Sequence, residues 1–228
     1  MEIIHLSLIE GAREATGTAV VIDVFRAFTT AAYAIAGGAE QIVPVATAKE
    51  AFQLRRLHPN WVLVGESHGV KIPGFDYGNS PIEVAAADIA GKTMVLRTSS
   101  GVQGILAASR AEEVLLGSFV TAEATIDYIR SRDPKVVSLV AMGWEGTKRT
   151  LEDELCADYI EARLSGERLN FAEMYSRMRA DEQGTKFFDR HQSHFTPADF
   201  EAAMSLDRFS FALRVERRET PVIIRVDR

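Results

Sequence analysis

The sequence predicts an α/β fold of three layers, with a mainly parallel or mixed sheet between two layers of helices. Residues 18–24 and 61–65 are almost wholly apolar, which is typical of strands that are covered on both faces. Segments with helical character alternate with these strands, and this alternation indicates β–α–β units. A change of character after residue 165 predicts a helical C-terminal region.

Strands and helices are expected to alternate as far as residue 164. Gly37-Gly38 ends a helix that begins at residue 26, and Thr47 with Glu50 forms a capping box for the next helix. The strands of this part are expected at residues 2–8, 17–24, 41–45, 61–65, 93–97, 113–116 and 136–141. The helices are expected at residues 26–36, 47–57, 82–87, 100–109, 122–130 and 151–164. Together they define an α/β core at residues 1–165, which is expected to carry the chemistry.

Residues 166–228 form a different kind of segment. A charged helix is expected at 169–180, and Thr196-Pro197 opens another helix, with Asp199 in its first turn. Strand-like residues at 209–216 and 222–226 end the chain. We expect a helical cap and closing strands within the same domain as the core. The alternative is that this region forms the far edge of the sheet.

Composition and charge narrow the class of protein. The chain has 228 residues, of which 46% are hydrophobic and 25% charged, as in soluble globular proteins. Its single cysteine, Cys156, excludes an internal disulfide and is expected to be buried packing. A net charge of −6 argues against nucleic acid but not against a small anionic substrate. No leader or membrane-length apolar run is visible, so the cytoplasm is expected. The apolar helix at 26–36 could pack a homodimer as well as a sheet.

A long loop at residues 71–81, KIPGFDYGNSP, follows the strand at 61–65. Its prolines and glycines break regular structure, while Phe75 and Tyr77 should anchor it to the core. Glu66 and His68 lie just past the same strand. Ligands of open α/β sheets bind at the carboxyl ends of the strands, so we expect function here; an ordinary structured connector is the alternative.

Asp23 ends an apolar strand, where a charge is costly unless it is paired or bound to a metal. It is either a structural partner of Arg26 and a helix cap, or a metal ligand or catalytic carboxylate. Phosphatases that form a phosphoaspartate of the haloacid-dehalogenase type need a second aspartate two residues on. Phe25 stands at that position, so this type of nucleophile is disfavoured.

Two helix starts offer further candidate groups. RTSSG at 97–101 combines an arginine, hydroxyl groups and a glycine at the start of a helix, which suits an anion; ordinary capping is the alternative. Glu152 and Asp153 follow Thr150, where acids complement the helix dipole or could reach a divalent cation. His68 is an acid/base candidate or incidental, and His191 with His194 lacks a partner cluster.

Five segments together resemble the 2-phosphosulfolactate phosphatase family. They are DVFRAFTT at 23–30, GESHG at 65–69, GFDYGNSP at 74–81, RTSSG at 97–101 and LEDELCA at 151–157, of which GNSP is the most specific. The likeness covers roughly residues 15–165 well and the tail loosely. It implies Mg²⁺-dependent hydrolysis of the phosphate monoester of 2-phospho-3-sulfolactate to 3-sulfolactate and phosphate. In methanogens this reaction serves coenzyme M biosynthesis.

The resemblance also implies one shared site. Asp23, Arg26 and Glu66 are the expected catalytic residues, and Asp23, Asp76 and Asp153 the expected Mg²⁺ ligands. The expected substrate contacts are Lys71, Asn79, Ser80, Arg97, Thr98, Ser99, Ser100 and Gly101. A water molecule activated by a carboxylate is the favoured nucleophile, with a covalent Asp23 intermediate as the alternative.

The chain departs from the family pattern at Ser67-His68, where a basic residue after the glutamate is frequent, and at Ser100, where an Asn-Gly pair often occurs. Both places are expected anion contacts. Two other functions therefore stay open, a phosphatase for a related phospho-hydroxy acid and a small-anion-binding protein without turnover.

Overall fold

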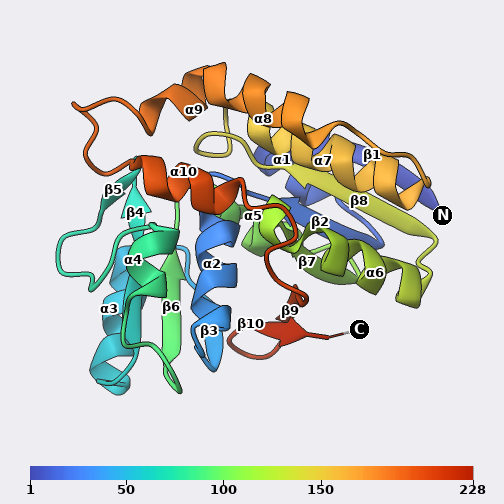
Figure 1. The fold of residues 1–228 in the computed structure, drawn as a ribbon. Coiled ribbons are helices and arrows are strands. Elements are labelled where there is room, and N and C mark those ends of the chain that lie inside the picture. Colours follow the sequence, from blue (N-terminus) through green and yellow to red (C-terminus); the bar gives the residue numbers. More distant parts are fainter. Residues whose placement is uncertain (228) are drawn as a thin grey trace.

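The computed structural model describes residues 1–227 and has the expected α/β architecture (Figure 1). In that range ten strands form one open sheet in the order β1-β8-β2-β7-β9-β10-β3-β6-β4-β5. The strands are β1 (Glu2–Ser7), β2 (Thr18–Ile22), β3 (Gln41–Pro44), β4 (Val62–Ser67), β5 (Val70–Lys71), β6 (Thr93–Arg97), β7 (Glu113–Gly117), β8 (Val136–Ala141), β9 (Ala212–Glu216) and β10 (Val222–Val226).

The helices that accompany the sheet agree with most of the expected ranges. They are α1 (Leu8–Glu14), α2 (Ala27–Ala36), α3 (Ala48–Leu57), α4 (Pro81–Ala85), α5 (Gly101–Ala107), the short 3₁₀ helix η1 (Phe119–Thr121), α6 (Ala122–Arg132), α7 (Leu151–Leu164), α8 (Phe171–Ala180), α9 (Glu182–Lys186) and α10 (Pro197–Ala203). Capping fixes several starts as expected: the Thr47 hydroxyl accepts the Glu50 N–H, and the Thr196 hydroxyl accepts the Asp199 N–H. The sequence did not predict α1, α9 or the short strand β5.

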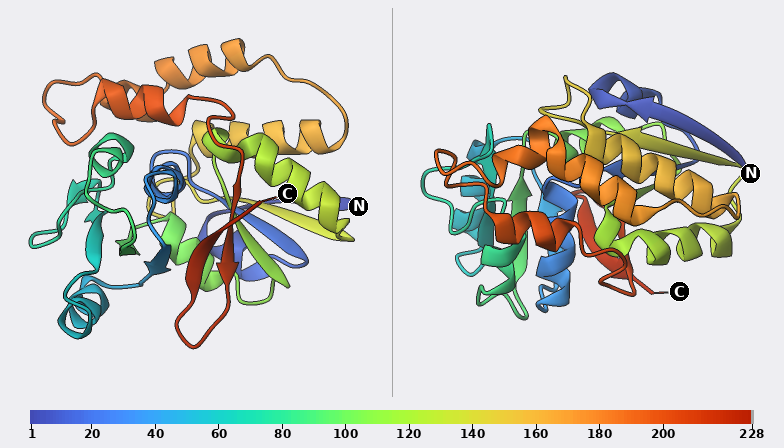
Figure 2. Two further views of the ribbon diagram at one scale, coloured as in Figure 1. Left: turned by 60° about the horizontal axis from the view of Figure 1, so that its bottom comes forward. Right: turned by 45° about the horizontal axis from the view of Figure 1, so that its top comes forward.

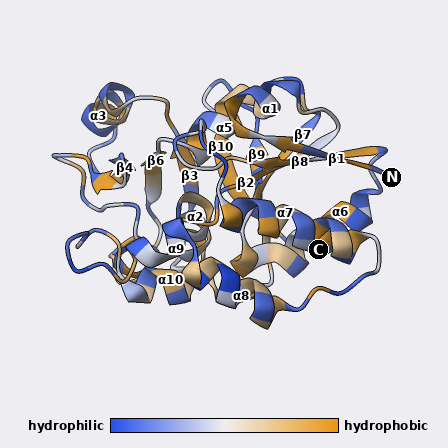
Figure 3. Ribbon diagram, turned by 90° about the horizontal axis from the view of Figure 1, so that it is seen from above, coloured by the Kyte–Doolittle hydropathy of each residue, from blue (hydrophilic) through white to orange (hydrophobic). Residues whose placement is uncertain are grey.

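Strand β2 shows how the sheet is covered on both faces. Its side chains alternate: Ala19 and Val21 belong to one hydrophobic cluster, while Val20 and Ile22 belong to another. The first cluster includes residues of α1, α2 and α5, and the second includes residues of α6, α7 and α10. The three expected layers are therefore present. Figure 3 shows the same pattern, with apolar strands inside and hydrophilic outer sides on helices such as α3.

The last two strands lie inside the sheet. Hairpin β9–β10 pairs antiparallel with β7 on one side and with β3 on the other, so it joins two groups of parallel strands (Figure 2, left). The alternative that the tail forms the far edge of the sheet is wrong. The physical reason is burial, because Leu213 and Ile223 are almost fully inaccessible and need neighbours on both sides.

Helices α8, α9 and α10 lie across one end of the molecule (Figures 1 and 2). Helix α10 packs against α4 and η1, and α8 packs against α7. The C-terminal region thus covers parts of both strand groups. Cys156 is fully buried in α7, as expected. Within residues 1–227 no helix combines the length and apolar character that crossing a membrane requires.

Candidate active site

A cleft with about 370 Å³ of empty space lies where β2, β4, β6 and β8 end. Strand ends from both parallel groups therefore contribute to one site, as the carboxyl-end rule for α/β sheets predicts. The cleft is lined by Asp23, Phe25, Arg26, Glu66, His68, Gly69, Asn79, Ser99, Ser100, Gly143, Trp144, Glu145 and Phe195.

Asp23 links the starts of two helices. Its Oδ1 accepts the Ala27 N–H at 2.9 Å and its Oδ2 accepts the Gly101 N–H at 2.8 Å. Burial raises the pKa of Asp23 to about 6. The hydrogen bonds from the two backbone N–H groups lower this pKa, and the nearby Glu66 carboxylate raises it further. Gly101 is needed here because a Cβ would lie 2.7 Å from Asp23 Oδ2. The carboxyl is thus fixed in place and can exchange a proton near neutral pH.

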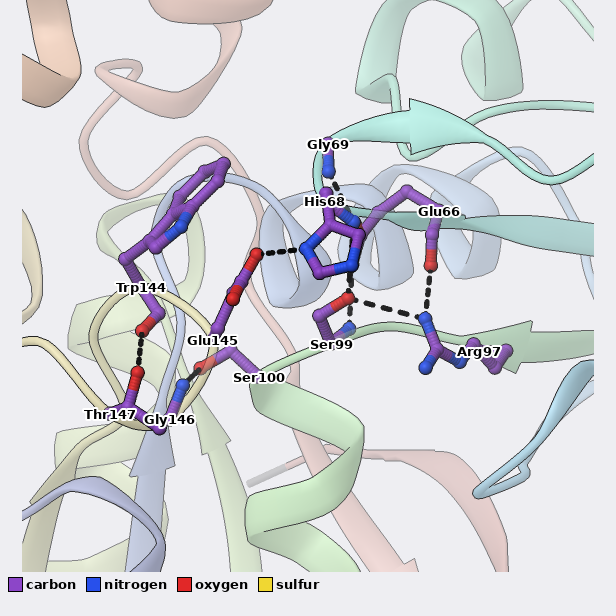
Figure 4. A network of polar contacts seen from close by, with 10 residues as sticks. All are labelled: Glu66, His68, Gly69, Arg97, Ser99, Ser100, Trp144, Glu145, Gly146 and Thr147. Carbon is purple, nitrogen blue, oxygen red and sulfur yellow. Dashed lines mark hydrogen bonds and ion pairs between the residues drawn. The ribbon is translucent and has the colours of Figure 1, made fainter.

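Glu66 is held in the same way by the other group of strands. Its Oε1 accepts the Ser99 N–H and its Oε2 accepts the Gly69 N–H, each at 2.6 Å (Figure 4). The loop at 97–101 therefore donates two backbone hydrogen bonds to carboxylates, one from the Ser99 N–H to Glu66 and one from the Gly101 N–H to Asp23. The expectation that these groups cradle a substrate anion needs correction, because Asp23 and Glu66 already occupy them. Ser99 and Ser100 still line the cleft.

Arg26 is a buried cation at the cleft, with 3% of its surface exposed. Its Nη1 donates to Asp199 Oδ2 at 2.9 Å and to the His194 carbonyl at 2.8 Å, and its guanidinium lies 4.6 Å from the centre of the Phe195 ring. Burial lowers the pKa of Arg26, and the ion pair with Asp199 opposes this. The C-terminal region therefore contributes directly to the site.

Asn79, from the GNSP segment, has a side-chain oxygen without a protein partner. The residue lines the cleft with 6% of its surface exposed, and Oδ1 is a buried acceptor that receives no hydrogen bond in the described part of the chain. A buried polar atom left unpaired costs about 1–3 kcal/mol. Asn79 therefore brings an unpaired oxygen acceptor to the wall of the cleft, and such an acceptor suits a cation or a hydrogen-bond donor of a ligand.

Asp153 connects strand ends beside the cleft rather than lining it. Its Oδ1 accepts the Val24 N–H and its Oδ2 accepts the Gly143 N–H, each at 2.8 Å. Burial, followed by the neighbouring Glu152 and Asp23 carboxylates, raises the pKa of Asp153 well above its usual range. The geometry supports a structural brace between the segments after β2 and β8, in place of the expected metal ligand.

Several expected contacts lie outside the cleft lining. Asp76 is exposed and engages Arg55 and the Leu63 N–H, and Lys71 is exposed in β5, so the structure brings neither to the cleft. The Ser80 hydroxyl accepts the Glu83 N–H at the start of α4 and donates to Asp199, the partner of Arg26. In the loop at 97–101, Thr98 accepts the Val102 N–H and Arg97 donates to the Glu66 carbonyl, whereas the Ser100 hydroxyl does not cap α5.

Hydrogen bonds of the Ser100 side chain hold the loop after β8 in place. The Ser100 hydroxyl donates to the Gly143 carbonyl at 2.6 Å. It also accepts the Gly146 N–H at 3.1 Å, as Figure 4 shows. This places Trp144 and Glu145 at the cleft, and the Trp144 ring also contacts the Lys186 ammonium at 4.0 Å. The sequence did not point to Trp144, Phe195 or Asp199 as site residues. The sequence does not single out Asp199 as a site residue, because an acid is expected in the first turn of any helix.

The donor atoms of the cleft fit a magnesium ion. Mg²⁺ prefers oxygen ligands and is commonly held by one or two carboxylates, with waters and substrate phosphate oxygens completing the shell. Asp23, Glu66 and Asn79 Oδ1 supply such oxygens from three segments. Within residues 1–227 there is no group of three or more His, Cys, Asp or Glu side chains arranged for a metal. An ion held in the cleft would need water or substrate oxygens to complete its ligand shell.

Glu152, next to Asp153, has a distinct and testable electrostatic state. Burial raises the pKa of Glu152 to about 8 from an ordinary 4.5, and Asp181 and Asp23 repel its charged form. Between these values the folded protein binds a proton that the unfolded chain has lost, so stability falls as pH rises from about 5 to about 8. Glu152→Gln removes this dependence.

We expect Glu152→Gln to exceed the wild type in free energy of unfolding at pH 8, on the order of a few kcal/mol, with a smaller difference near pH 5. Urea unfolding at several pH values measures this, with the exposed Glu167→Gln as the control. A difference between wild type and Glu152→Gln that did not change with pH would contradict the buried, protonated state.

Known proteins resemble this chain over most of its length. The family model for 2-phosphosulpholactate phosphatase matches residues 5–211. A "Probable 2-phosphosulfolactate phosphatase" of Bacillus subtilis is 35% identical over 211 residues, covering 91% of each chain. A protein of the same name from Caldicellulosiruptor saccharolyticus is 36% identical and covers 81% of each chain.

These likenesses place the chain, with its carboxylate-lined cleft, among the phosphoric monoester hydrolases. The chain belongs to the 2-phosphosulfolactate phosphatase family.

Proposed function

We propose that this protein hydrolyses the phosphate ester of 2-phosphosulfolactate to 3-sulfolactate and inorganic phosphate, with Mg²⁺ in the cleft. The observation that carries the proposal is that Asp23, Glu66 and Asn79 line one cleft, and that Asn79 Oδ1 is a buried acceptor without a partner among the described residues. Relatives that share the chain's length bear the name of this activity. When bound, Mg²⁺ would supply charge stabilisation at the phosphoryl oxygens.

The protein's own groups supply positioning and proton transfer. Arg26 keeps N–H donors beyond those that Asp199 and His194 use, because its Nη2 has only a long contact of 3.5 Å with the Gly69 carbonyl. These donors can bind a phosphoryl oxygen. Asp23, whose pKa is about 6, accepts the proton of the attacking water. The water oxygen bonds to phosphorus as the bond between phosphorus and the substrate's C2 oxygen breaks. The C2 oxygen takes a proton from water to become the hydroxyl of sulfolactate, and Asp23 returns its proton to the solvent.

Phosphate release from 2-phosphosulfolactate tests the proposal. We expect release with Mg²⁺, its loss in excess EDTA and its return when Mg²⁺ is added back. The comparison substrates are 2-phospholactate, which lacks the sulfonate, and 2-phosphoglycerate. Release from only these would indicate a phosphatase for another phospho-hydroxy acid. Binding without release from any of the three would indicate a small-anion-binding protein. A trapped phosphoryl group on Asp23 would replace direct water attack with a covalent intermediate.

A further inference from the structure

We propose that His68 and Glu145 together select for the sulfonate of the substrate, His68 exchanging its bond with Glu145 for one with a sulfonate oxygen. This inference rests on the proposed phosphatase activity, since it concerns how the same cleft chooses among phosphate esters. It assigns a specificity role to two residues whose side chains take no part in the phosphoryl transfer described above.

The pair spans the cleft. His68 follows β4 and Glu145 lies in the loop after β8, so the two residues come from different groups of parallel strands. The Nδ1 atom of His68 is hydrogen-bonded to Oε1 of Glu145, as Figure 4 shows. Both residues line the cleft. The contact therefore forms part of the wall of the cleft.

The pair is the most exposed polar contact of the cleft. The side chains of His68 and Glu145 are 76% and 31% exposed, whereas Asp23, Arg26 and Glu66 are buried. An exposed ion pair contributes little to stability, so its replacement by another partner costs little. The backbones that present the pair are fixed, because the Ser100 hydroxyl holds the Gly146 N–H and Glu66 holds the Gly69 N–H. The side chains can therefore change partners without movement of their loops.

The exchange requires no proton transfer. A carboxylate only accepts hydrogen bonds, so the Nδ1 atom that faces Glu145 carries the hydrogen. A sulfonate oxygen is also only an acceptor and carries a negative charge, and it can replace the carboxylate at the same N–H. Arg26 lies on the same cleft, where its free N–H donors are assigned to the phosphoryl group. The Nδ1–H group of His68 is thus a separate donor that a second anion can use.

The test compares two substrates that differ in the sulfonate. His68→Gly is chosen because glycine tolerates the left-handed backbone at this position, where φ is 53°, and has no side-chain N–H donor. We expect KM for 2-phosphosulfolactate to rise about 10- to 100-fold with little change in kcat, the size typical of a hydrogen bond to a charged group. The kinetic constants for 2-phospholactate should stay within about twofold. Glu145→Gln should lower KM for the sulfonated substrate, because the competing carboxylate is gone.

The matched control is His58→Gly, which changes a histidine that stacks on Trp61 outside the cleft. It should leave the ratio of kcat/KM for the two substrates unchanged. Equal losses on both substrates in His68→Gly, or an unchanged ratio, would overturn the exchange. Absence of phosphate release by the wild-type protein from either substrate would instead contradict the proposed function, and the specificity claim with it.

Discussion

Asp23→Asn should lower kcat for phosphate release by about 10³-fold or more while the protein stays folded. In the proposed reaction the Asp23 charge accepts a proton and binds a cation, and loss of such acid–base catalysis typically costs 10²–10⁴-fold. The substitution also affects the carboxylate's contacts, because an amide must turn an N–H₂ group toward the N–H of either Ala27 or Gly101. Steady-state phosphate release and circular dichroism measure the two effects.

Asp76→Asn is the matched control for this prediction. The exposed Asp76 carboxylate engages Arg55 and the Leu63 N–H and does not line the cleft. We expect its kcat to remain within about twofold of wild type. A loss of activity in Asp76→Asn as large as that in Asp23→Asn would mean that the reaction takes place elsewhere than in the cleft described above.

Asp199→Asn should destabilise the protein by about 3–5 kcal/mol, because it leaves the buried Arg26 guanidinium without its counter-ion. Both side chains are almost inaccessible, at 2% and 0% exposed, and Asp199 also accepts the Ser80 hydroxyl at 2.6 Å. For a chain of this size the melting temperature should fall by roughly 6–20 °C. Thermal unfolding measures this shift, and kcat/KM should fall with it because Arg26 loses its fixed position.

A double variant separates the effect of the buried charge on stability from the effect of side-chain packing. Arg26→Met combined with Asp199→Asn removes both charges, so most of the lost stability should return while phosphate release stays low. An unchanged melting temperature in the single variant Asp199→Asn would contradict the ion pair as a stabilising contact. Recovery of activity in the double variant would show that Arg26 does not contact the substrate.

The sequence predicts the layers of this fold because their signals are local. Apolar runs such as 18–22 define strands, and the Thr47–Glu50 box marks the start of a helix at its own position. The place of β9–β10 between β7 and β3 depends on which strands pair across the whole chain. No local pattern contains that information, so the sheet order could not be predicted.

Some residues of the candidate site could also be predicted from local sequence, whereas others could not. Asp23 and Glu66 could be predicted because a charge at the end of a buried strand is conspicuous, and Asn79 because its segment resembles a known motif. Asp76 was an expected Mg²⁺ ligand, but its carboxylate points toward Arg55 and the Leu63 N–H. Its nearness to Asn79 in sequence does not determine the direction of its side chain. Asp199 and Phe195 reach the cleft only because the C-terminal region folds over Arg26. Such contacts depend on tertiary docking.

The most direct test of the central claim is a crystal structure of the protein with Mg²⁺ and 3-sulfolactate. We expect the metal within coordination distance of Asp23 or Glu66 and of Asn79 Oδ1, and the sulfonate next to His68. Metal and product bound at another surface, such as the groove between α3 and the β9–β10 turn, would contradict the assignment of the cleft as the active site.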